Sequence, residues 1–126
     1  MKKMLMMLGV AAALLTTGCV STPVPPMDRR VTLAPNLGSS LYVTDVRCTK
    51  GNSAFYTFQA NVVNNCSSEL WVEYKVVWVN AEGMAINPNA VWEKTAIVAH
   101  EIKALQYTAP SAEAVDMLFY VRRLVQ

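Results

Sequence analysis

The stretch that decides the fold is LWVEYKVVWV, residues 70–79. Apolar and polar side chains alternate along it with a period of two residues, which is typical of a β-strand with one buried and one solvent-facing side. The face predicted to point inward carries Leu70, Val72, Tyr74, Val76 and Trp78. The opposite face carries Trp71, Glu73, Lys75 and Val77. We therefore predict a strand that buries Trp78 between two sheets and leaves Trp71 exposed.

The same alternation recurs on both sides of this stretch. It predicts further strands over residues 41–48, 54–64, 92–98, 101–108 and 116–124. Short segments rich in Gly, Pro, Asn and Ser separate the strands, so neighbouring strands should run antiparallel. A helix is predicted only as a single turn at residues 111–114. We predict an all-β fold, a small antiparallel immunoglobulin-like β-sandwich of about six or seven strands, with a small barrel as the alternative.

The N-terminus has the pattern of a secretory signal. Lys2 and Lys3 precede an apolar run over residues 4–15, which is shorter than the roughly 20 residues that a membrane-spanning helix needs. Gly18 stands directly before Cys19, and this junction resembles the lipobox of bacterial lipoproteins, in which the cysteine is acylated. We predict that residues 1–18 are a lipoprotein signal peptide and that Cys19 carries the lipid. Ordinary cleavage, which would leave Cys19 as a thiol, is the alternative.

The next segment has no periodic apolar pattern and contains prolines at positions 23, 25, 26 and 35. Proline favours an extended backbone, so we predict that residues 19–37 are a tether and that the folded domain covers residues 38–126. Val20 follows the lipidated cysteine, and a non-acidic residue there implies sorting of a lipoprotein to the outer membrane. The predicted location is therefore the periplasmic side of the outer membrane.

Length, composition and charge limit the kind of protein. The chain has 126 residues, of which 53% are hydrophobic and 16% charged, which suits one folded domain. Of its 11 basic residues, two lie in the predicted signal peptide, which leaves nine against nine acidic residues. A neutral domain lacks the basic surface that phosphate neutralisation requires, so nucleic acid is not expected as a partner.

Several segments carry a resemblance to a known family. They are VVNN at residues 62–65, YKVVWVNAEGM at 74–84, Trp92, TAPSAEAVD at 108–116 and Val121-Arg122. In their order and spacing they resemble the YcfL family of small bacterial lipoproteins, over roughly residues 41–123. The resemblance implies a lipid anchor and a β-sandwich. Because the family is biochemically uncharacterised, it implies no catalytic residue.

The residues themselves predict no catalytic chemistry, metal or cofactor. His100 is the single histidine and lies in a predicted turn, while the carboxylates are spread singly over strands and turns. We expect a non-enzymatic module that is attached to the membrane and docks an envelope protein or peptidoglycan. An enzyme acting on envelope material and a carrier of a small ligand are the alternatives.

The outward face of residues 70–79 is the predicted partner-binding surface. Trp71 and Val77 flank the opposite charges of Glu73 and Lys75, a mixture of apolar and polar groups found at interfaces. The alternative is a solvated sheet face with no partner.

Two cysteines remain in the predicted domain. Strand geometry predicts that Cys48 and Cys66 lie too far apart for a disulfide. We therefore predict two unpaired thiols, with Cys66 the more exposed of the two.

Overall fold

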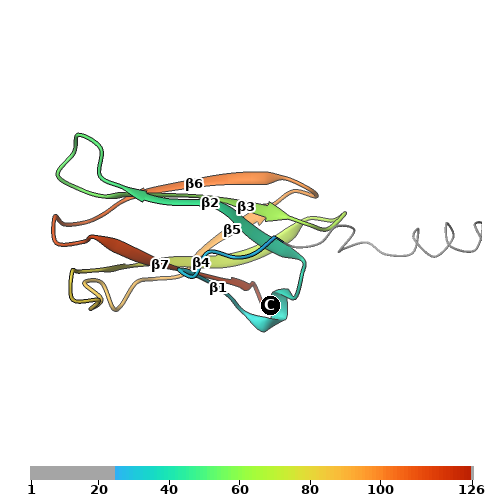
Figure 1. Cartoon of the computed structure of the whole chain (residues 1–126). Coiled ribbons are helices and arrows are strands. Elements are labelled where there is room, and N and C mark those ends of the chain that lie inside the picture. Colours follow the sequence, from blue (N-terminus) through green and yellow to red (C-terminus); the bar gives the residue numbers. More distant parts are fainter. Residues whose placement is uncertain (1–24, 126) are drawn as a thin grey trace, which may run out of the picture.

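The structure is a computed structural model that describes residues 25–125 (Figure 1). The segment predicted as a signal peptide, together with Cys19, lies outside these residues. The described elements, in chain order, are β1 (Val31–Leu33), the 3₁₀ helix η1 (Pro35–Leu37), β2 (Leu41–Thr49), β3 (Thr57–Asn64), β4 (Leu70–Val79), β5 (Glu93–Ile97), β6 (Ile102–Thr108) and β7 (Asp116–Arg123). Among these residues, no helix is long and apolar enough to span a membrane.

The strands form two sheets that lie one over the other as a sandwich (Figure 1). One sheet has the order β1-β7-β4-β5 and the other has the order β2-β3-β6. All neighbouring strands run antiparallel except β1, which pairs parallel with β7. The predicted all-β sandwich is confirmed, and six predicted strands correspond to β2 through β7.

The core lies between the two sheets and is built from the faces that the alternation predicted. The rings of Phe58 on β3 and Phe119 on β7 lie 5.1 Å apart, so side chains of opposite sheets interdigitate. Trp78 is 4% exposed and joins this core, as predicted. Removal of these apolar surfaces from water is the main favourable term for such a small domain.

The boundary predicted between tether and domain differs from the structure. Residues 31–33 form β1, and Leu37 in η1 is fully buried, so the end of the predicted tether belongs to the sandwich. The sequence did not predict β1, because a three-residue strand is too short to show an alternation and prolines lie on both sides of it. The domain therefore begins near Asp28 instead of residue 38.

Two smaller features differ in detail. The predicted helical turn at residues 111–114 is a plain turn closed by a hydrogen bond from the Ala114 N–H to the Ser111 carbonyl. The pairing of β2 with β3 shifts register between Thr44 and Arg47, and Asp45 adopts a positive φ of 54° there. A bulge of this kind bends β2 and turns Asp45 toward the outer face of its sheet.

Candidate docking face

The four residues of the predicted partner-binding surface lie along β4, in the middle of the four-stranded sheet. Trp71 is 46% exposed, as predicted. Glu73, Lys75 and Val77 are less exposed than Trp71: all three are half-buried among neighbouring side chains of the sheet. Trp71 also donates a hydrogen bond from Nε1 to Glu69 at 3.1 Å, which fixes one edge of the indole.

Strands β5 and β7 widen this surface with residues that were not among the predicted partner-binding residues. Glu73 lies opposite Lys94 of β5 and opposite Arg122 of β7, and Lys75 lies opposite Tyr120. Trp92, just before β5, covers the middle of the group. We call the outer side of the sheet around Trp71, Glu73, Lys75, Trp92, Lys94, Tyr120 and Arg122 the docking face.

Cations and aromatic rings stack on the docking face. The guanidinium carbon of Arg122 lies 3.8 Å from the centre of the Trp92 ring, and Lys75 Nζ lies 4.8 Å from it. Lys75 is also 5.5 Å from the Tyr120 ring. A cation within about 6 Å of an aromatic face is attracted by the ring quadrupole. These contacts connect Trp92 to side chains of β4 and β7.

An ion pair completes the arrangement. Arg122 donates from Nε to Glu73 Oε1 at 2.9 Å, and the Glu73 side chain is 16% exposed against 43% for Arg122. Such a partly exposed pair contributes about 1 kcal/mol or less to stability. The ion pair holds the Arg122 guanidinium in contact with Trp92. The side chains of the docking face therefore fix one another's positions.

Sequence reasoning located β4 correctly but missed Trp92, Tyr120 and Arg122. Strand phase alone does place Tyr120 and Arg122 on the side opposite the buried Phe119 and Val121. Their position beside Lys75 depends on β7 being the neighbour of β4, which a strand pattern does not specify.

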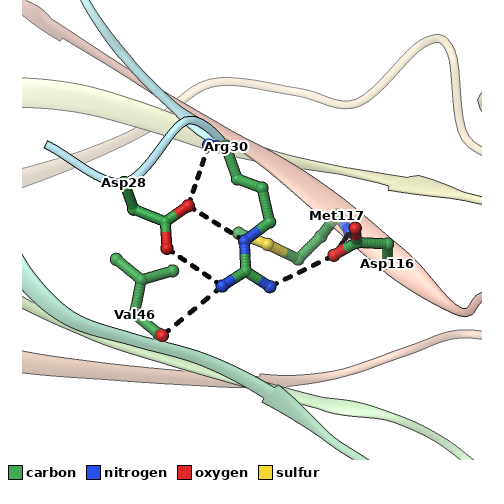
Figure 2. Close-up of polar contacts among 5 residues, drawn as sticks. All are labelled: Asp28, Arg30, Val46, Asp116 and Met117. Carbon is green, nitrogen blue, oxygen red and sulfur yellow. Dashed lines mark hydrogen bonds and ion pairs between the residues drawn. The ribbon is translucent and has the colours of Figure 1, made fainter.

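A second polar cluster fastens the N-terminal end of the domain (Figure 2). Arg30 donates to Asp28 at 3.0 Å through Nε, to Asp116 of β7 at 3.3 Å and to the Val46 carbonyl of β2 at 3.5 Å. The hydrogen bond from Arg30 is the main reason that the pKa of Asp28 is below its usual range, and Asp28 raises the pKa of Arg30 in return. Arg30 thus bridges both sheets, and its role is structural.

The described residues show no metal site and no paired catalytic groups. Within residues 25–125, no group of three or more His, Cys, Asp or Glu residues could hold a metal ion. His100 is exposed in a turn with a φ of 59°. At the edge between the sheets, Tyr107 meets Tyr74 and Glu93, and burial raises the pKa of Tyr107, so its hydroxyl keeps its proton. This cluster links the two sheets by hydrogen bonds.

The outer side of the three-stranded sheet also has a hollow, of about 370 Å³. Four of its polar side chains are paired with one another, because Asn61 donates to Asp45 at 3.0 Å and Gln59 donates to Gln106 at 3.1 Å. The hollow lies on the surface, outside the packed space between the sheets.

The prediction for the two cysteines is confirmed in part. Cys48 is a free thiol, so the two do not form a bridge, and burial raises the pKa of Cys48. Cys66 is not a free thiol, so the prediction of two unpaired thiols is wrong there. Cys66 is also 3% exposed, so the prediction that it is the more exposed of the two is wrong. Its turn folds inward because the Cys66 N–H donates to the buried Asn64 side chain at 2.9 Å.

Residues 28–123 match the family model described as a protein of unknown function, DUF1425. The chain belongs to the DUF1425 family. The match begins at Asp28, where the structure also begins the domain. No curated protein matches the chain.

Two solved structures have the same fold. The crystal structure of Campylobacter jejuni cj0090 has a TM-score of 0.64 at 21% identity, covering 77% of this chain and 100% of that one. A DUF1425 family member from Shewanella sp. pv-4 has a TM-score of 0.61 at 17% identity, covering 68% of this chain and 80% of that one. At these identities the likeness establishes the fold alone.

Proposed function

We propose that this DUF1425 protein is a lipid-anchored, non-enzymatic binding module of the bacterial envelope. The Gly18-Cys19 junction after a basic and apolar leader supports lipidation of Cys19, and Val20 supports the outer membrane as the destination. The resemblance to the YcfL lipoproteins agrees with this location. A folded domain that begins at Asp28 leaves residues 19–27 as tether, which at ~3.1 Å per residue spans roughly 30 Å.

The docking face is the part of the domain that meets the partner. The observation that carries this proposal is the exposed Trp71 beside a surface where Arg122 and Lys75 stack on Trp92. Tryptophan, tyrosine and arginine are enriched at the centres of interfaces because they combine large apolar area with directed polar groups. The partner is an envelope protein or peptidoglycan.

A binding role is favoured over catalysis by the state of the polar groups. The carboxylate of Glu73 is paired with Arg122, and those around Arg30 are paired as well, so neither cluster offers an unpaired base beside a nucleophile. A carrier function would need an enclosed cavity, whereas Phe58 and Phe119 fill the space between the sheets.

Capture of envelope material by the immobilised mature protein tests the docking role. Trp71→Ala should weaken capture by about 2 kcal/mol or more, as truncation of an interface anchor does. Ile102→Ala is the matched control, because Ile102 is also an exposed large apolar side chain but lies on β6 of the other sheet. Equal capture by the wild-type and Trp71→Ala proteins would leave the face without a partner.

A further inference from the structure

Positive charge is concentrated at one end of the docking face. The chain beyond its predicted signal peptide has nine basic and nine acidic residues. Lys94, Arg122 and Arg123 nevertheless line one hollow of about 400 Å³, in which Glu73 is the only carboxylate among the described lining residues. Among the described lining residues, positive charges therefore exceed negative charges by two, although basic and acidic residues are equal in number across the domain.

The cationic groups of this hollow are held in place by the fold. Arg123 donates from Nε to the Asn36 carbonyl at 3.1 Å and from its terminal nitrogen to Ser40 Oγ at 3.2 Å. Arg122 is held through Nε by Glu73 and stacks on Trp92. Asn36 comes from η1, so the segment predicted as tether supplies one wall of the hollow.

Part of this positive charge is left uncompensated. Lys94 is exposed and makes no ion pair within residues 25–125. The contact of Arg122 with Glu73 uses Nε, which leaves its terminal guanidinium nitrogens to meet a ligand. A guanidinium and an ammonium beside one another can hold a carboxylate by charge-assisted hydrogen bonds.

We propose that the hollow lined by Lys94, Arg122 and Arg123 binds carboxylate side chains of an acidic peptide segment, which is the part of the partner that lies next to Trp71. This inference rests on the proposed docking function and names the chemistry of its partner. Opposite charge gives the complementarity, and Leu124 and Val125 add an apolar wall for the peptide chain.

The test uses the full-length protein in detergent micelles and fluorescently labelled poly-L-glutamate, with binding followed by fluorescence anisotropy. We expect saturable binding that weakens as salt is raised, and no binding of poly-L-lysine. Lys94→Ala should weaken binding about two- to fivefold, as loss of one exposed ion pair does. Lys94→Glu should weaken it by about tenfold or more, because like charges then meet.

Lys50→Ala is the matched control, because Lys50 is an exposed lysine in the loop between β2 and β3 of the other sheet. It should bind as the wild type does. Absence of poly-L-glutamate binding would overturn the inference, and so would equal effects of Lys50→Ala and Lys94→Ala. Competition by inorganic phosphate that exceeds competition by acetate at equal ionic strength would also overturn it, in favour of a phosphate ligand.

The two proposals fail in different ways. If poly-L-glutamate does not bind but Trp71→Ala still weakens envelope capture, the docking function stands and the acidic partner is wrong. If Lys94→Ala weakens poly-L-glutamate binding but Trp71→Ala leaves capture unchanged, the hollow binds carboxylates and the docking role of Trp71 is wrong.

Discussion

Trp71 and Trp78 lie on the same strand and have opposite environments. The pleat of β4 sends them to opposite faces, so Trp78 is 4% exposed in the core and Trp71 is 46% exposed on the docking face. A tryptophan in a packed core is surrounded by atoms that lose contacts when it is removed, whereas a surface tryptophan has mostly water as neighbour. Substitution of Trp78 therefore tests the stability of the domain, and substitution of Trp71 tests binding of a partner.

Substitution of each tryptophan should give a different unfolding result. Trp78→Ala should lower the free energy of unfolding by about 3–5 kcal/mol, because a cavity opens between the sheets. Trp71→Ala should change it by about 0.5 kcal/mol or less, as surface substitutions do. Denaturant unfolding followed by circular dichroism measures both, and equal losses of stability would show that the faces of β4 are assigned incorrectly.

At the scale of elements, β1 shows where sequence patterns end. The ten residues of β4 reveal their alternation, and the strand was predicted with its observed bounds, Leu70–Val79. The three residues of β1 are too few to show an alternation. Their place in the sheet depends on pairing with β7 and on the long-range contact of Arg30 with Asp116, which a local pattern does not reveal. The same limit hid Trp92 and Arg122, because their contacts depend on which strands are neighbours.

The attachment of β1 should depend on pH through Asp28. Because Arg30 lowers the pKa of Asp28 in the folded protein, the carboxylate contributes stability above its usual pKa of about 4. That contribution is lost as pH falls through the lower folded pKa. Asp28→Asn should remove about 1 kcal/mol or less at neutral pH and make the fall in stability below pH 4 less steep.

Thermal unfolding between neutral and acid pH measures this effect. Glu113→Gln is the control, since Glu113 is an exposed carboxylate without an ion pair among the described residues. An equal change in the pH dependence of thermal stability in both variants would mean that the Arg30 cluster does not fasten β1.

At the scale of the whole molecule, the lipid anchor that we propose at Cys19 precedes a sandwich that begins near Asp28. The domain includes β1 and η1, so the tether is shorter than the prolines alone suggested. With the lipid anchor and periplasmic location that we propose, this short tether places the expected partner close to the membrane surface. Lipidation of Cys19 is the step on which this placement depends.

Replacement of the anchor should stop maturation. Cys19→Ala should give an unprocessed precursor that takes up no labelled fatty acid, whereas Cys48→Ala should mature normally because Cys48 belongs to the folded domain. A cysteine that carries a thioether cannot form a disulfide, so the mass of the N-terminal peptide after non-reducing digestion decides which modification Cys19 carries. Normal maturation of Cys19→Ala, or a disulfide-linked Cys19 peptide, would contradict the anchor.

Site-specific photocrosslinking in intact cells tests the central claim, that the β4 face meets a partner, most directly. A photoreactive residue at position 71 should give discrete adducts with an envelope component, and one at position 102 on the other sheet should give none. These adducts should decrease when Lys94→Glu is combined with the probe at position 71. Adducts of equal amount from positions 71 and 102, or from position 102 alone, would contradict the account.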